Sequence, residues 1–296
     1  MPSLKDIRSR IDSTKNTQQI TRAMKMVSAA KLRRAQQNVV NLRPYANTIL
    51  SVIADVAATG EVSHPLLRQQ EEGQTPQKLL IVVITSDRGL AGGFNTNVNK
   101  FADRFYQENK SRYQTVDTLF IGRKAQDYFR RRGFKAVDQI TNMAKDISYD
   151  YAAHLANRLM DDFNKGDYDE IRVVYNEFKS AISQQVVAEA LLPIDTSKAS
   201  SLAKGEGGFP AMMIFEPAPE KIMDRLIAKH FIVQVYRCLS ESVAAEHGAR
   251  MTAMENATKN AGEMINSLTL NYNKLRQAAI TTELIEITSG AEALKG

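Results

Sequence analysis

A long proline-free stretch at the C-terminal end of the chain is the feature that most constrains the fold. No proline occurs between Pro219 and Gly296. Within this stretch, mostly apolar residues recur at alternating steps of three and four, which is typical of a left-handed coiled coil. We call these positions the C-terminal seam: Met251, Met254, Thr258, Ala261, Ile265, Leu268, Tyr272, Leu275 and Ala279. A helix over residues 220–294 would be on the order of 110 Å long.

The N-terminal end shows a similar pattern. Pro44 is the only interior helix breaker in residues 4–58, and the first glycine is Gly60. The apolar residues at helical spacing are Leu4, Ile7, Ile11, Ile20, Met24, Val27, Leu32, Ala35, Val39 and Leu42. Such a helix spans about 80 Å, whereas a compact domain of about 160 residues has a radius of gyration near 15 Å. The two helices are therefore expected to project from the middle of the chain and to pack on each other in antiparallel orientation.

The middle of the chain alternates short apolar strands with amphipathic helices. Strands are predicted at 79–85, 116–121, 134–140, 170–178 and 184–194, and helices end near Asn109, span 123–132 and run from a Ser148 cap to Asn164. This alternation predicts a parallel or mixed sheet. Residues 60–77 and 195–210 indicate a linker and a mobile loop.

The predicted fold class is thus α/β, with a long antiparallel coiled coil of N- and C-terminal helices plus a Rossmann-like α/β domain. The expected division is residues 1–58 for the first helix, 78–215 for a globular foot domain and 220–296 for the last helix.

The glycine loop after the first strand, residues 86–95 (SDRGLAGGFN), raises the question of a nucleotide site. A strand, a glycine-rich turn and a helix can bind phosphate. The glycines here match neither GxGxxG nor GxxxxGK[ST], and the loop has no lysine, so a structural turn is favoured and no cofactor is expected. The four histidines form no metal or catalytic motif and are expected at the surface. The single cysteine, Cys238, excludes an intrachain disulfide and multi-thiolate zinc sites.

The net charge of +6 is concentrated at the N-terminal end, where residues 1–58 hold ten basic and three acidic side chains. The basic run 22–34 has three readings: a solvated helix face, a nucleic-acid surface or a contact with an acidic protein. The absence of aromatic residues before Tyr45 weakens the single-stranded nucleic-acid reading. No aliphatic run approaches the roughly 20 residues that span a bilayer, and the charged N-terminus argues against a signal peptide.

Several motifs resemble the gamma subunits of F-type ATP synthases, in their bacterial form without the chloroplast redox insertion. They are residues 3–11 (SLKDIRSRI) and 16–27 (NTQQITRAMKMV), the loop 86–95, and residues 250–258 (RMTAMENAT), 276–284 (RQAAITTEL) and 289–291 (SGA). The resemblance includes both ends and the middle of the chain in the order of the family. The chloroplast-type insertion with its redox cysteine pair is missing, and the single cysteine cannot form that pair, so thiol regulation by that route is ruled out.

The resemblance implies a central rotor stalk. The terminal helices would form a shaft inside a ring of alpha and beta subunits, and the α/β domain would rest on epsilon and the membrane c-ring. Rotation would force three beta sites through different nucleotide affinities and so couple proton flow to ATP synthesis or hydrolysis. Catalysis would belong to alpha and beta, and this chain would hold no cofactor, metal or nucleic acid. Its expected place is peripheral, on the cytoplasmic face of a bacterial inner membrane.

Candidate contacts with the beta subunit follow from the same resemblance. The motifs imply Arg276, Gln277, Thr281 and nearby Arg250 and Glu283, together with Met24 and Lys25 facing an acidic lobe of beta. Charge more than motif adds Arg33 and Arg34. The alternative from another class is a free-standing nucleotide- or nucleic-acid-binding α/β protein with helical arms.

Overall fold

The computed structural model describes residues 3–58, 64–67, 76–141, 147–181, 183–194 and 219–294. Contacts divide the chain into two units. The helical unit contains Met1–Ser28 and Met251–Gly296, and the sheet unit contains Ala29–Arg250. The predicted mobile loop at 195–210 lies outside the described residues, as does most of the predicted linker at 60–77.

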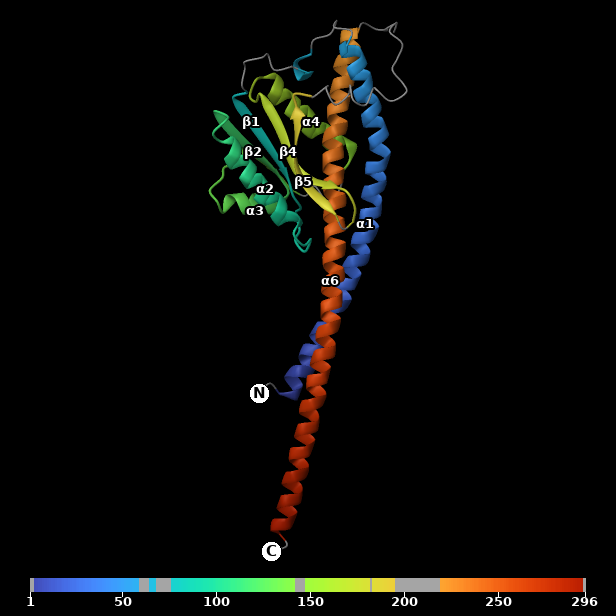
Figure 1. The fold of residues 1–296 in the computed structure, drawn as a ribbon, viewed down its shortest axis with the longest axis vertical. Helices are drawn as coiled ribbons and strands as arrows, with labels where there is room; N and C mark the ends of the chain where they lie inside the picture. Colours follow the sequence, from blue (N-terminus) through green and yellow to red (C-terminus); the bar gives the residue numbers. More distant parts are fainter. Residues whose placement is uncertain are drawn as a thin grey trace. The chain divides into compact units, whose positions relative to one another are not determined.

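Two long helices are the first and last elements of the chain (Figure 1): α1 spans Leu4–Ala58 and α6 spans Pro219–Ala293. At the start of α1, the Ser3 hydroxyl accepts a hydrogen bond from the Asp6 N–H, and the Asp6 carboxylate accepts one from the Ser3 N–H. This reciprocal cap satisfies donors that an uncapped helix start would leave free. Pro44 does not interrupt α1. Both long helices predicted from the sequence are confirmed.

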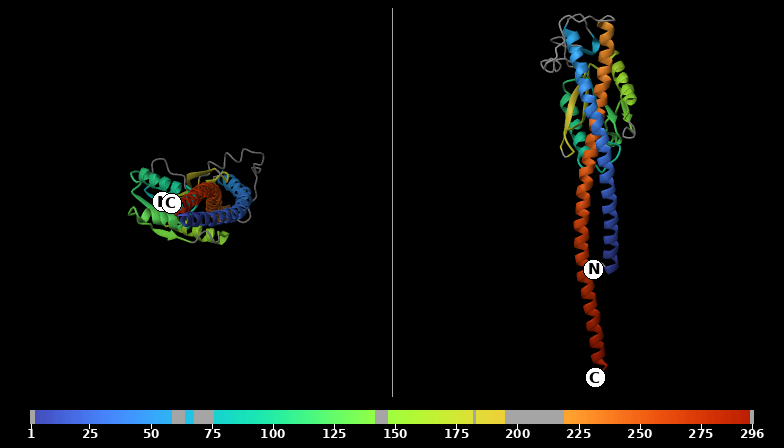
Figure 2. Two further views of the ribbon diagram at one scale, coloured as in Figure 1. Left: turned by 90° about the horizontal axis from the view of Figure 1, so that it is seen from below. Right: turned by 90° about the vertical axis from the view of Figure 1, so that its right-hand side faces the viewer.

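In the helical unit, α1 and α6 lie side by side in opposite directions, and α6 continues past the N-terminal end of α1 (Figure 2). Thr14 contacts Met264, whereas Lys25, farther along α1, contacts Glu255, nearer the start of α6. Decreasing numbers on one helix thus meet increasing numbers on the other, which confirms the antiparallel pairing. All nine positions of the C-terminal seam are buried or partly buried.

The seam of α1 differs from the predicted apolar stripe. Ile20 and Val27 are 60% and 57% exposed. The covered positions step by fours and threes from the predicted apolar Ile7 and Ile11 on to polar residues: Thr14, Gln18, Thr21, Lys25 and Ser28. The Thr21 and Thr258 hydroxyls lie 2.8 Å apart, so these polar groups satisfy each other between the helices. Apolar spacing therefore predicted the helix correctly and part of its buried face incorrectly.

The sheet unit contains a five-stranded sheet in the order β3-β2-β1-β4-β5. The strands are β1 Lys78–Ile84, β2 Thr115–Ile121, β3 Asp138–Ile140, β4 Glu170–Phe178 and β5 Gln184–Leu192. The first four are parallel, and β5 pairs with β4 in antiparallel orientation. The mixed α/β sheet predicted from the sequence is confirmed.

Side chains of β1 alternate between two cores. Leu79, Ile81 and Val83 face the core beneath α2 (Phe94–Asn109) and α3 (Arg123–Arg130). The alternate residues face the core of α4 (Tyr149–Asn164) and parts of α1 and α6. Because both faces of β1 are covered, its nearly continuous apolar sequence is what a central parallel strand requires.

Two segments differ from their predicted structure, a strand that is shorter and a linker that contains a helical turn. The strand expected at 134–140 is reduced to β3, because Phe134 packs its ring edge-on against Phe129 and Tyr106 instead. The linker contains a short 3₁₀ helix, Pro65–Leu67, whose Leu66 is buried in the core and accepts a hydrogen bond from the Ile194 N–H.

Candidate interaction surface

The glycine loop between β1 and α2 lies where an α/β protein would bind phosphate, and side chains in and beside it bond to two nearby amide groups. The Asp87 carboxylate accepts a 3.1 Å hydrogen bond from the Arg123 N–H at the start of α3. The Asn95 amide oxygen accepts 3.0 Å bonds from the Ser86 N–H and hydroxyl. A carboxylate here also repels an anion. The geometry therefore favours a structural turn.

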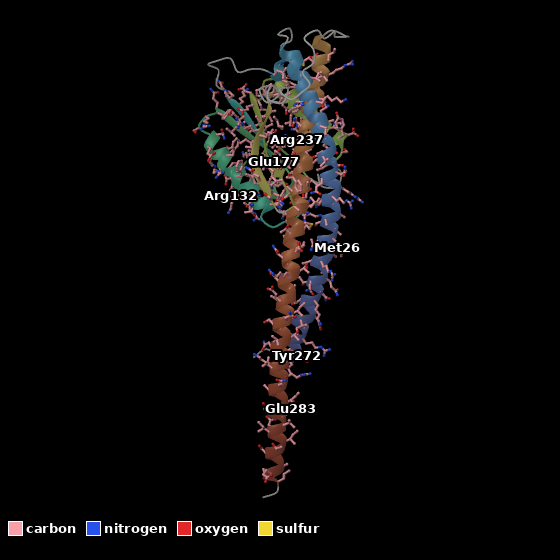
Figure 3. All side chains as sticks on the ribbon, turned by 45° about the vertical axis from the view of Figure 1, so that its right-hand side comes forward. Met26, Arg132, Glu177, Arg237, Tyr272 and Glu283 are labelled. Atoms are coloured by element: carbon pink, nitrogen blue, oxygen red, sulfur yellow. The ribbon has the colours of Figure 1, made fainter. Side chains whose placement is uncertain are left out.

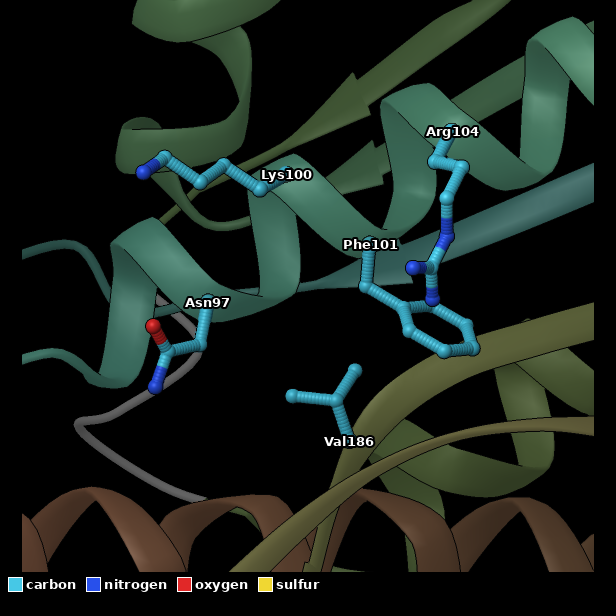
Figure 4. A pocket seen from close by; sticks show the side chains of 5 residues that line it. All are labelled: Asn97, Lys100, Phe101, Arg104 and Val186. Atoms are coloured by element: carbon cyan, nitrogen blue, oxygen red, sulfur yellow. The ribbon is translucent and has the colours of Figure 1, made fainter.

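A hollow of about 470 Å³ lies between α2 and the edge strand β5 (Figure 4). It is lined by Asn97, Lys100, Phe101, Arg104 and Val186. The Arg104 guanidinium lies 5.3 Å from the centre of the Phe101 ring and pairs with Glu108 at 3.7 Å. Nucleotides in parallel sheets bind at the carboxyl ends of the strands, whereas this hollow lies on the flank of α2. We assign it no nucleotide.

Two histidines expected at the surface are buried: His230 is 2% exposed and His247 is 7% exposed. Both lie on the part of α6 that belongs to the sheet unit. Burial lowers the pKa of each to about 4, with a further lowering by Arg237 near His230 and by Arg250 near His247. Among the described residues, no three His, Cys, Asp or Glu side chains could together hold a metal ion.

Arg250, predicted as a beta contact, is buried within this chain. Its guanidinium forms a 2.7 Å ion pair with Glu246 and donates a 3.2 Å hydrogen bond to the Gly89 carbonyl in the glycine loop. Burial raises the pKa of Glu246, against the opposing effect of Arg250. Arg250 therefore connects α6 to the glycine loop.

The other predicted cations on α1 differ in their surroundings. The Lys25 ammonium lies 2.6 Å from the Glu255 carboxylate of α6, in a pair whose side chains are 38% and 55% exposed. Met24 is half-buried beside it. Arg33 and Arg34 are both exposed in the sheet unit. Of the four residues, the two arginines are the exposed ones.

The last part of α6 is exposed on all sides. Every described residue from Ile280 to Leu294 is exposed, and so are Arg276 and Gln277. Four predicted beta contacts lie here, namely Arg276, Gln277, Thr281 and Glu283. Figure 3 shows Tyr272 near the N-terminal end of α1 and Glu283 on the stretch beyond it. An apolar stripe at helical spacing, Ile280, Leu284 and Ile287, is exposed on the same stretch.

Sequence reasoning missed two features of this surface. Glu255, the partner of Lys25, flanks the seam position Met254, where charged residues of coiled coils commonly pair, so its place in the heptad was an available signal. The partners of Arg237 on the sheet were also missed. A charged residue within an otherwise apolar helical stretch was the signal there.

No described helix is long and apolar enough to cross a membrane.

Known relatives match the whole chain. The model of the ATP synthase family matches residues 3–294. The ATP synthase gamma chain of Bdellovibrio bacteriovorus is 63% identical over 298 residues, covering 100% of both chains. That of Geobacter metallireducens is 48% identical over 297 residues, again covering 100% of both.

Solved structures agree with this assignment. A chain of the central stalk and c-ring of Tetrahymena thermophila mitochondrial ATP synthase is 28% identical, with a TM-score of 0.60 over 80% of this chain and 99% of that one. A chain of Euglena gracilis mitochondrial ATP synthase, 24% identical, shares the fold with a TM-score of 0.67 over 98% of this chain and 94% of that one. The chain belongs to the family of ATP synthase gamma chains.

Proposed function

We propose that this chain is the central rotor of an ATP synthase and couples proton flow to ATP synthesis or hydrolysis. Family membership makes it a subunit of such a complex. The observation that carries the rotor role is the exposed stretch of α6 beyond the end of α1. Exposed apolar side chains on one helix are a surface for other subunits to cover.

The asymmetry of the helical unit supplies a mechanism. Three beta sites around a shaft can differ only if the shaft offers each a different surface, because a contact equal in all states shifts no equilibrium. A pair of unlike helices is not three-fold symmetric, so each site meets another face. Rotation then exchanges these faces among the sites and changes their nucleotide affinities in turn.

The exposed stretch of α6 is suited to turning inside a sleeve. Strong ion pairs would hold the shaft at one angle, and residues 280–294 carry no basic side chain and only three carboxylates, Glu283, Glu286 and Glu292. The hydroxyls of Thr281, Thr282 and Thr288 donate hydrogen bonds to carbonyls one turn earlier in the same helix. These groups therefore need no partner on the sleeve, which supports weak contacts that can be exchanged.

We propose direct contacts with beta for the exposed residues Arg33, Arg34, Arg276, Gln277, Thr281 and Glu283. Three further residues stay predicted contacts with beta, but they are buried or partly buried in this chain: Met24, Lys25 and Arg250. Lys25 already pairs with Glu255, and Arg250 with Glu246 and the glycine loop. Their first effect on beta would be to position the helical pair and that loop.

The chain is proposed to be non-catalytic, with ATP turned over by alpha and beta. The bonds from the Arg123 amide to Asp87 and from the Ser86 amide to Asn95 support this proposal. We place the chain peripherally, on the cytoplasmic face of a bacterial inner membrane, bound to epsilon and the c-ring. The test is purification with an affinity tag: alpha, beta and epsilon should copurify in a complex with ATPase activity. Tight stoichiometric nucleotide binding or ATPase activity of the isolated chain would contradict the proposal.

A charge reversal tests the contacts on α1. The double variant Arg33→Glu/Arg34→Glu leaves the Lys25–Glu255 pair intact and should weaken assembly or ATP-driven proton pumping several-fold at low salt. The matched control, Arg130→Glu/Arg131→Glu, changes the net charge equally at exposed positions on and just after α3. Equal pumping by the two variants would remove the charge argument.

A further inference from the structure

Apolar packing holds α6 in the sheet unit but sets its rotation loosely. One face of α6 buries Met223, Ile227, Phe231, Val235 and Leu239 in the core. Apolar burial is not directional. It decides which side of a helix faces inward, while small rotations about the helix axis change the buried area little. A directional contact is needed to set the angle closely.

Arg237 makes such contacts with two neighbouring strands at once. One terminal nitrogen donates a 2.6 Å hydrogen bond to Glu189 on β5, and the other donates a 3.2 Å bond to the Tyr175 hydroxyl on β4. The Tyr175 hydroxyl in turn donates to Glu189 at 2.9 Å. Figure 3 labels Arg237 on α6 beside the sheet. Two strands and one planar guanidinium together define an orientation, as a single contact would not.

The same guanidinium is also fixed from within α6. Its Nε donates a 2.8 Å bond to the Gln234 side chain, and Glu241 lies 3.5 Å from a terminal nitrogen. Tyr175 and Glu241 are each 1% exposed. Partners one turn before and one turn after Arg237 hold its side chain, so that a displacement of α6 must displace the contacts to both strands.

We propose that Arg237 is a positioning residue that locks the rotation of α6 against β4 and β5. The consequence for coupling rests on the proposed function: torque passes along α6 only when this helix cannot turn against the sheet. Buried polar networks can select one arrangement among several of similar apolar packing. In this chain the arrangement selected is the rotational setting of a helix that contributes to both units.

Cys238 is a built-in reporter for this lock. It is the single cysteine, it follows Arg237 directly, and it is 1% exposed. Burial raises the pKa of its thiol to about 12, while the neighbouring Arg237 charge opposes that rise. If α6 moves more freely against β4 and β5, this part of the core opens more often and the thiol reaches solvent more often. Removing the Arg237 charge would by itself raise the thiol pKa further and slow labelling, so faster labelling of a variant must come from exposure.

The experiment labels Cys238 with a thiol reagent in the purified full chain under native conditions. Arg237→Met keeps an apolar stem without the guanidinium and should label at least about tenfold faster than the unaltered chain. Arg237→Lys, which keeps the charge but not the fork, should show a smaller increase. The control Arg132→Met removes an arginine that pairs with Asp103 and lies over the Tyr128 ring. It should label at the unaltered rate.

Two results would overturn the lock. One is labelling of Arg237→Met no faster than that of the unaltered chain. The other is an increase that urea unfolding of the same variant accounts for entirely by global unfolding. This assay needs no partner subunit, so its outcome is separate from the proposed function. In the reconstituted complex, Arg237→Met should lower proton pumping per ATP hydrolysed, and an unchanged ratio would contradict the coupling role.

Discussion

His230 is neutral in the folded chain because it is buried on the inner face of α6. Its pKa is lowered from 6.5 to about 4. Between these values the unfolded chain binds the proton and the folded chain does not, so stability is lost as the pH falls from 7 to 5. The expected loss is about 1–2 kcal/mol for this residue. Urea unfolding at both pH values measures it.

The variant His230→Gln isolates this contribution. It should reduce the loss of stability between pH 7 and pH 5, whereas His154→Gln, at an exposed position of α4, should not. The comparison between variants is needed because other groups titrate too, and the raised pKa of Glu246 acts in the opposite direction. An identical pH dependence in the two variants would show that His230 is not the group responsible.

Gly122 lies between β2 and α3 in a conformation that residues with a side chain rarely adopt. Its φ is +97°, and a Cβ there would lie 2.2 Å from the Thr85 carbonyl oxygen. Gly122→Ala should therefore destabilise the chain by more than about 2 kcal/mol, combining backbone strain with a clash. Gly133 has φ +77° with nothing within 4 Å of the added Cβ. Gly133→Ala should cost only about 1 kcal/mol, and equal costs in urea unfolding would rule out the clash.

At the scale of elements, the two long helices show what an amphipathic pattern can and cannot predict. The C-terminal seam was predicted at all nine positions because its residues are mostly apolar. The seam of α1 was missed at Thr21 and Ser28, since buried polar residues carry no apolar periodicity; the Thr21 hydroxyl bonds with that of Thr258 on α6. Lys25 was predicted to face another subunit, but its contact with Glu255 depends on the register of the pair.

The ends of the helical pair should differ in their importance for stability. Residues 285–294 are all exposed, so deleting residues 285–296 should shift the midpoint of thermal unfolding by less than about 2 °C. It should still impair coupled ATPase in the complex. Deleting residues 3–13 removes the buried Ile7 and Ile11 and should lower the midpoint clearly. A similar fall for the two deletions would mean that the exposed stretch of α6 is packed in solution.

For the whole molecule, the type of sheet was predictable, whereas the strand order and the side-chain networks were not predicted. The alternation of strands and helices indicated a parallel or mixed sheet, and its order β3-β2-β1-β4-β5 comes from the structure. The contacts of Arg237 with Tyr175 and Glu189 join elements far apart in sequence, and no local pattern specifies which polar side chains meet. The burial of His230 likewise depends on how elements far apart in sequence pack together. Tertiary packing, which decides both, is visible only in the structure.

The division of the chain into foot and shaft helices stays a prediction, and the sheet core suggests how to test it. The core includes Met223, Ile227 and Phe231 of α6 and Ile53 of α1, all outside residues 78–215. Burying each such side chain is worth roughly 1.5–3 kcal/mol, and a whole domain is stable by only about 5–15 kcal/mol. A fragment of residues 78–215 should therefore lose most of its free energy of unfolding. It should bind a hydrophobic dye and unfold without cooperativity. The fragment 29–250 keeps the complete core and should unfold in one cooperative urea transition. Cooperative unfolding of 78–215 at the same urea midpoint would show that the foot folds without the long helices.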